Sequence, residues 1–296
     1  MYKDGTGREW KISITTPAGR EKYLSIFKKY IYRDVKAGIV DEWQLWLNTV
    51  NINDIAYIES MAAENDKVKI FRLDEAITPT WESYNALQTH KFFKNSHDDN
   101  TIYIRFDDDI VWYEPGCIEK IAQARIDHPE AFAIYPNVIN STIVNSWHQK
   151  SGALGKEAGE VRQEKDDYKN DDDRNWAYLD AFNYTDSKFV DCIHDTFKKH
   201  YDEGTLSDYY LPSRSLDNFQ RFSICSLAWW GKEHVAPGPS EEAQMSWELP
   251  KSNNRPNWLC GDALMVHYSY HTQRDYLVRE GDKHLVFYKK LSDEIV

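Results

Sequence analysis

The pattern of apolar and polar positions divides the first half of the chain into short strands that alternate with amphipathic helices. Residues 10–17, "WKISITTP", alternate between the two kinds of position, which predicts a strand. Leu24, Phe27 and Ile31 then recur at i, i+3 and i+7, which indicates a helix with one buried face. The same criteria predict strands over 39–50, 68–75, 101–109 and 131–139, and helices over 54–65, 81–96 and 115–130. Strands alternating with helices indicate an α/β fold, with a mainly parallel sheet flanked by helices.

This periodic pattern stops near residue 148. Residues 156–175, "KEAGEVRQEKDDYKNDDDRN", are polar and acidic and show no apolar period. We therefore interpret residues 148–180 as a mobile acidic insertion and not as part of the core. Beyond the insertion, the pattern predicts a helix at about 187–202, an apolar run over 221–231 and a final strand over 260–270.

Composition narrows the classes of function. Of the 296 residues, 41% are hydrophobic and 28% are charged, which is typical of a soluble globular protein. The net charge of −12 and the lack of long Lys/Arg runs argue against a non-specific nucleic-acid binder. No apolar run approaches the roughly 20 residues of a membrane span, and the first ten residues contain no apolar signal region. The four cysteines are widely spaced, so we expect reduced thiols and a cytoplasmic location.

Three consecutive aspartates, Asp107, Asp108 and Asp109, end the predicted strand in "YIRFDDDIVW". Ligands of open α/β sheets bind beyond the carboxyl ends of the strands. Residues 107 and 109 would lie on one side of an extended backbone, where two carboxylates can hold a hard divalent ion such as Mg²⁺ or Mn²⁺. A solvated acidic turn is the alternative. The same tripeptide at 171–173 follows no strand, and we interpret that copy as solvated charge.

The order of these motifs resembles that of the GT-A fold glycosyltransferases, of the bacterial and phage type. The resemblance rests on the strand, Thr–Pro loop and helix at the start, on "YIRFDDD", and on the C-terminal "GDALMVHYSYHTQRDYL". It implies a Rossmann-like sheet in a single catalytic domain, residues 1–296. Residues 1–147 would then bind a nucleotide-diphosphate-sugar, and residues 181–296 would bind the acceptor.

The resemblance also implies roles for particular residues. The Asp-x-Asp motif would hold Mn²⁺ or Mg²⁺ against the donor diphosphate, with a late histidine as a further ligand. His267 is preferred to His271, because the alternating pattern of the last predicted strand would direct the His267 side chain out of the core and into the cleft. The implied metal ligands are Asp107, Asp109 and His267, and the candidate donor-binding residues are Thr15, Thr16, Pro17, Arg20, Asn48, Arg105, Asp107 and Asp108.

The chemistry of sugar transfer adds two further expectations. The leaving diphosphate needs its charge neutralised, which a divalent ion does, and an inverting reaction needs a carboxylate to deprotonate the acceptor hydroxyl. The turn "GPSEEAQMSW" supplies Glu241 and Glu242 for this purpose, although both can equally favour the N-terminus of a helix. Trp229 and Trp230 are candidates for stacking on an acceptor sugar.

The sequence therefore predicts a metal-dependent glycosyltransferase whose acceptor is a glycan, a protein or a modified nucleic-acid base. A nucleotide-sugar-binding module without turnover is one alternative, and a metal-dependent nucleotidyltransferase or phosphatase is another. A dinucleotide-dependent oxidoreductase and a P-loop kinase are disfavoured, because neither GxGxxG after the first strand nor GxxxxGK[ST] is present.

Overall fold

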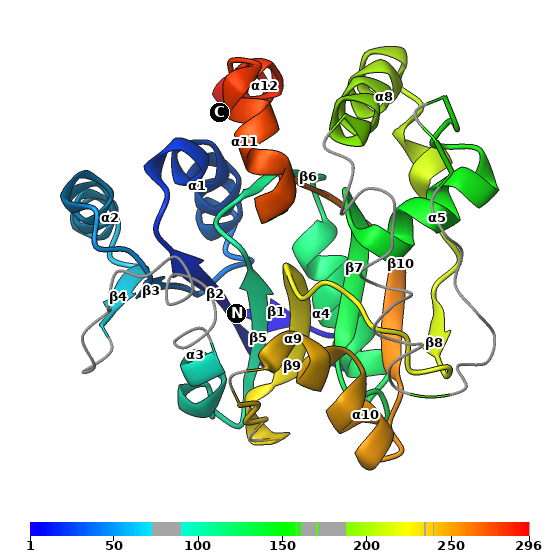
Figure 1. Cartoon of the computed structure of the whole chain (residues 1–296). Helices are drawn as coiled ribbons and strands as arrows, with labels where there is room; N and C mark the ends of the chain where they lie inside the picture. The colour runs from blue at the N-terminus through cyan, green and yellow to red at the C-terminus, as the bar shows by residue number, and fades with distance from the viewer. Residues whose placement is uncertain are drawn as a thin grey trace.

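The structure is a computed structural model that describes residues 1–72, 90–157, 159–160, 170, 188–233, 235–238 and 240–295. Within these residues, one sheet carries the fold (Figure 1). Its strands are β1 (Tyr2–Lys3), β2 (Glu9–Ala18), β3 (Glu42–Leu47), β4 (Val68–Phe71), β5 (Thr101–Phe106), β6 (Ile110–Tyr113), β7 (Ile134–Ile139), β8 (Arg214–Leu216), β9 (Ser226–Trp230) and β10 (Asn257–His267).

Helices pack against both faces of this sheet. They are α1 (Glu21–Lys36), α2 (Ile52–Glu64), α3 (His90–Asn95), α4 (Cys117–Asp127), α5 (Thr142–Ser151), α8 (Phe189–Glu203), α9 (Glu241–Ala243), α10 (Leu249–Ser252), α11 (His271–Arg279) and α12 (Lys283–Asp293). One buried cluster joins the sheet to α1, α4, α8 and α12, and a second joins it to α3 and α5. None of the described helices is long and apolar enough to cross a membrane.

The sheet is mixed but mostly parallel, with the order β4-β3-β2-β5-β9-β7-β10-β6. Strands β2 to β5 are mutually parallel, β9 runs antiparallel between β5 and β7, and β10 runs parallel to β7. From β2 the chain moves outward to β3 and β4, and it then returns to the opposite side of β2 to form β5. This reversal of strand order is a topological switch point, the position at which ligands bind in open α/β sheets.

Most of the predicted elements in the described residues are confirmed. The first helix, α1, buries Leu24, Phe27 and Ile31 as expected. The predicted helix over 54–65 is α2, which begins where the side chain of Asn51 accepts a hydrogen bond from the backbone N–H of Asn53. Of the predicted strand over 68–75 and helix over 81–96, the described parts are β4 and α3, and the remainder lies outside the described residues.

Two expectations in the middle of the chain were wrong. The predicted strand over 101–109 ends at Phe106, and a separate strand, β6, follows the aspartates and pairs antiparallel with β10. The insertion predicted over 148–180 begins too early, because α5 continues to Ser151 and buries His148 and Gln149. This helix escaped detection because several of its buried positions are polar, including Asn145, Ser146 and His148, so few apolar residues mark its buried face. Most of the remaining insertion lies outside the described residues.

Candidate active site

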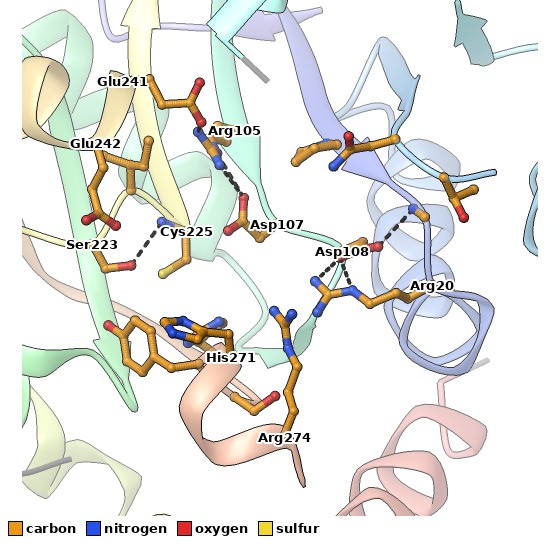
Figure 2. A pocket seen from close by; sticks show the side chains of 18 of the residues that line it. Arg20, Arg105, Asp107, Asp108, Ser223, Cys225, Glu241, Glu242, His271 and Arg274 are labelled. Carbon is orange, nitrogen blue, oxygen red and sulfur yellow. Dashed lines mark hydrogen bonds and ion pairs between the residues drawn. The ribbon is translucent and has the colours of Figure 1, made fainter. Parts of the chain in front are cut away.

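A cleft of about 1310 Å³ opens beyond the carboxyl ends of β2, β3 and β5, at the switch point of the sheet. Its lining comes from the loop after β2, the loop after β3, the turn after β5, residues 221–225, the start of α9 and the start of α11. Segments distant in the sequence therefore meet at this one edge, as Figure 2 shows. The lining is rich in charge of both signs, with four arginines among the lining residues.

The three aspartates form a turn between β5 and β6. The backbone N–H of Ile110 donates to the carbonyl oxygen of Asp107 at 3.2 Å, so the chain reverses here. The expectation that Asp107 and Asp109 share one side of an extended backbone is therefore wrong. The physical reason is that β6 pairs antiparallel with β10, which requires the chain to turn directly after β5. Asp107 consequently pairs with Arg105, whereas Asp108 and Asp109 share Arg20.

Asp109 is directed into the protein and is only 1% exposed. Its Oδ1 atom lies 3.4 Å from Nε2 of His267, and its Oδ2 atom lies 3.0 Å from Nη1 of Arg20 and 3.4 Å from Nη2 of Arg274. Burial alone would raise the pKa of Asp109, but these positive partners outweigh burial and hold its pKa well below the usual range. Asp109 is therefore ionised and serves as the centre of a cationic cluster.

His267 occupies the last position of β10, and its Nδ1 atom lies 3.2 Å from the carbonyl oxygen of Asn140. Burial by itself would lower the pKa of this histidine, but the Asp109 carboxylate raises it above the ordinary value. Nδ1 beside a carbonyl oxygen must carry hydrogen, so Nε2 faces Asp109 with an N–H in the charged ring and offers a lone pair only in the neutral ring, the form that a metal ion would need. The structure thus brings together Asp109 and His267, two of the three residues named as metal ligands.

Asp108 anchors the loop that follows β2. Its Oδ2 atom accepts a hydrogen bond of 2.9 Å from the backbone N–H of Gly19, and its Oδ1 atom accepts from Nε of Arg20 at 2.9 Å and also from Nη2. A side chain at Gly19 would place its Cβ 2.8 Å from the carbonyl oxygen of Asn48. Glycine is therefore required for the close approach of these two loops. Asp108 is only 3% exposed, so its main role in the structure is to position Arg20.

Arg105 connects the aspartate turn to α9 across the cleft (Figure 2). Its Nε and Nη2 atoms lie 2.9 Å and 2.8 Å from Oδ1 of Asp107, and its Nη1 atom lies 3.2 Å from Oε1 of Glu241. The guanidinium is nearly buried and lies between these two carboxylates. Sequence analysis placed Arg105 near the donor but gave no indication of the contact with Glu241.

The two candidate bases differ in their surroundings. Glu241 is buried and bound to Arg105, whereas the Glu242 side chain is 33% exposed and lies 3.0 Å from Nη2 of Arg221. Figure 2 shows the Glu242 carboxylate pointing toward Ser223 and away from Arg105. Both glutamates line the cleft. Only Glu242, however, presents a carboxylate with substantial access to a ligand in the cleft.

Some candidate residues lie outside the cleft. Thr15 and Thr16 are fully buried within β2, where the Thr16 hydroxyl accepts a hydrogen bond of 3.0 Å from Nε1 of Trp43. Trp229 and Trp230 belong to the core: the ring of Trp229 packs against Phe93, and neither tryptophan lines the cleft. The expectation that these tryptophans stack on an acceptor was wrong, because β9 is an interior strand with both faces covered. Pro17, Arg20 and Asn48 do line the cleft, as expected.

Several cleft residues were not predicted from the sequence, and Gly19, Arg221 and Arg274 are among them. A weak signal existed for Arg274, which follows His271 by three residues and so lies on the same face of a helix that begins there. Arg221 stands in a segment without regular structure before β9 and gave no signal.

The fit of a divalent ion to this site depends on the available donor atoms. Within the described part of the chain, no three His, Cys, Asp or Glu side chains lie close enough together to hold a metal. Asp109 and His267 provide a carboxylate oxygen and an imidazole nitrogen 3.4 Å apart, and that oxygen accepts no hydrogen bond. Two protein ligands are sufficient where the phosphates of a substrate and water complete the coordination, as is common for Mg²⁺. His267 lines the cleft, whereas Asp109 lies behind it, so an ion at this pair would have these two protein ligands and would need a phosphate-bearing ligand in the cleft to complete its coordination.

Comparisons with known proteins add no family to these observations. No protein-family profile matches the chain, and a search of curated proteins found no match. The geometry of the cleft is therefore the basis for a functional conclusion. It offers a switch-point site with bound arginines, an ionised buried aspartate and one accessible glutamate.

Proposed function

We propose that this protein is a glycosyltransferase of GT-A fold, which moves a sugar from a nucleotide-diphosphate-sugar to an acceptor hydroxyl. The observation that carries the proposal is the aspartate turn, which follows β5 at the switch point and places Asp109 3.4 Å from His267. Residues after β2 and β3, including Pro17, Arg20 and Asn48, complete the donor side of the cleft. The acceptor is a glycan, a protein or a modified nucleic-acid base, and the free cysteines among the described residues accord with a cytoplasmic location.

Asp109 and His267 would hold Mn²⁺ or Mg²⁺ in this scheme, and the ion would neutralise the charge that develops on the leaving diphosphate. Mn²⁺ suits the pair better, because an imidazole is a softer ligand than Mg²⁺ prefers. Asp107 is bound to Arg105 and would act on the donor through that pair. Asp108 would keep Arg20 in place at the edge of the cleft.

Glu242 is the proposed general base of an inverting transfer. Its carboxylate would accept the proton of the acceptor hydroxyl while the acceptor oxygen bonds to the anomeric carbon. In the same step the bond between that carbon and the diphosphate breaks, and the diphosphate leaves with the electron pair. Glu241 is less suited to this role because its carboxylate is buried against Arg105. General-base catalysis of this kind contributes roughly 10²–10⁴-fold to the rate.

A donor panel tests the proposal. The purified protein would be incubated with UDP-, GDP- and TDP-sugars, with and without Mn²⁺, and nucleotide release would be measured. A CMP-sugar, which lacks a diphosphate, serves as the control. We expect slow hydrolysis of one nucleotide-diphosphate-sugar. Binding of a donor without any turnover would indicate a binding module, and formation of a nucleotide-sugar from a nucleoside triphosphate would indicate a nucleotidyltransferase. Failure to bind any donor would exclude the proposal.

A further inference from the structure

Two arginines from distant elements meet at one carboxylate oxygen on the donor side of the cleft. Arg20 precedes α1, and Arg274 lies in α11. Their guanidinium groups lie 3.0 Å and 3.4 Å from Oδ2 of Asp109, which is itself only 1% exposed. Both arginines line the cleft. A buried carboxylate therefore holds two cations side by side at a surface that a ligand can reach.

The two guanidinium groups differ in how many of their N–H donors already have a partner. Arg20 donates to Asp108 through Nε and Nη2, and its Nη1 faces Asp109, so most of its donor capacity is used. Arg274 has a single contact with Asp109 at 3.4 Å, and its Nε atom is buried without a hydrogen-bond partner in the described structure. Because a guanidinium carries five N–H donors, Arg274 retains most of its donors for a ligand. Its side chain is 31% exposed and extends from α11 toward the aspartate turn (Figure 2).

The surroundings favour a multivalent anion. The N-termini of α1 and α11 both lie at this edge of the cleft, and the backbone N–H groups at such ends attract negative charge. Arginine binds phosphate oxygens in a bidentate geometry that a carboxylate contact at 3.4 Å does not saturate. Asp108 and Asp109 therefore orient the two arginines at the edge of the cleft.

We propose that Arg274, assisted by Arg20, binds the diphosphate of a nucleotide directly, so that the cleft holds a nucleoside diphosphate even without a divalent ion. This inference rests on the donor class of the proposed function. It adds Arg274 as a phosphate ligand. It also assigns Arg20 to the phosphates of the nucleotide and not to its nucleobase. The ion held by Asp109 and His267 would then add to a site that already binds the anion.

Calorimetric titration of UDP and GDP in the presence of EDTA tests this inference. We expect measurable binding to the wild-type protein, and we expect Arg274→Gln to weaken it by about tenfold to a hundredfold, the usual effect of losing a charge-assisted hydrogen bond. Arg279→Gln is the matched control, because Arg279 lies in the same helix with a 70% exposed side chain outside the cleft. It should bind within about twofold of the wild type, as expected for an exposed charge.

Two further measurements keep the inference falsifiable. The loss in Arg274→Gln should be larger for UDP than for UMP, because only the diphosphate offers the second phosphoryl group. If Arg274→Gln unfolds, Arg274→Lys provides a variant that keeps the charge and should bind more weakly than the wild type. Lack of nucleoside diphosphate binding in EDTA, or equal affinity in wild type and variant, would overturn the inference. If the nucleoside diphosphate binds in EDTA but no sugar is transferred, the inference holds and the proposed function fails. If sugar is transferred but binding requires the ion, the proposed function holds and the inference fails.

Discussion

Arg105 and Glu241 are 136 residues apart in the sequence, and Nη1 of the arginine lies 3.2 Å from Oε1 of the glutamate. The same guanidinium binds Asp107, so one buried cation connects the aspartate turn with the start of α9. The two sides of the cleft, formed by the aspartate turn and by α9, therefore share a single polar network. This contact also distinguishes the two adjacent glutamates, because Glu241 is bound to Arg105 whereas the Glu242 carboxylate faces the cleft.

The first prediction concerns these glutamates. Glu242→Gln keeps the shape of the side chain but removes its basicity, so we expect sugar transfer to fall by roughly 10²–10⁴-fold while donor affinity is unchanged. Glu241→Gln removes a partner of the buried Arg105, so it should mainly lower the free energy of unfolding. Turnover and donor titrations on both variants distinguish these effects.

Full activity in Glu242→Gln would contradict the assignment of the base. Asp262 is a poor substitute for it, because that residue lies near Lys120 and does not line the cleft. The anomeric configuration of the product then becomes informative, since a retaining reaction needs no base of this kind.

The second prediction compares two aspartates of the same turn. Asp109→Asn leaves the buried His267 and the partly exposed Arg274 without their charged partner, while Arg20 keeps Asp108, so we expect a loss of about 3 kcal/mol in the free energy of unfolding. Asp107→Asn should cost about 1 kcal/mol or less, because Arg105 keeps its contact with Glu241. Urea denaturation of both variants measures the difference. Equal losses would indicate that the structure assigns the wrong partners to Asp109.

The third prediction concerns acid stability. His148 and His194 are buried, and burial lowers the pKa of each to about 3. Hydrogen bonds fix their neutral forms: Nε2 of His148 lies 2.8 Å from the side-chain oxygen of Asn137, and Nε2 of His194 lies 2.9 Å from the carbonyl oxygen of Tyr268. An unfolded histidine titrates near about 6.5. Between that pH and about 3, the unfolded chain binds more protons, so the free energy of unfolding decreases as the pH falls.

Denaturation midpoints measured at several pH values between 7 and 5 test this expectation. His148→Gln and His194→Gln should each show a shallower decline than the wild type, by at most about 1.4 kcal/mol per pH unit. Identical slopes in the wild type and both variants would contradict it. The contribution of His267 has the opposite sign, because its pKa is raised in the folded protein and its stabilisation is lost as the pH increases.

The fourth prediction separates core packing from acceptor binding at Trp229. Its ring is fully buried, 4.6 Å from the ring of Phe93 and stacked at 5.6 Å on Tyr103, as measured between ring centroids. Trp229→Ala should lower the free energy of unfolding by about 3–5 kcal/mol. Because the residue does not line the cleft, the milder Trp229→Phe should leave the KM for any acceptor unchanged. A specific rise in that KM would restore the stacking hypothesis.

The sequence alone determined the elements whose pattern is local. Alternation in β2 and the apolar period of α1 follow from contacts between near neighbours, and both elements were predicted within a few residues of their observed bounds. Asp107, Asp109, His267 and the two glutamates were also identifiable, because strand ends and helix starts can be recognised from sequence patterns. The local pattern did not reveal α5, because polar residues such as Asn145 and His148 occupy several of its buried positions.

Only the tertiary structure decided which of these residues meet. The pairing of Asp109 with His267 requires β10 to end beside the turn after β5, and the Arg105–Glu241 contact requires α9 to lie across the cleft. The insertion of antiparallel β9 between β5 and β7 likewise buried both Trp229 and Trp230, whereas the sequence left open whether one of them reaches an acceptor. A charge pair between distant segments produces no periodic pattern in the sequence, since the strand order decides which charged residues meet. Strand order in turn depends on how the whole set of apolar faces is buried at once, which no short stretch of sequence specifies.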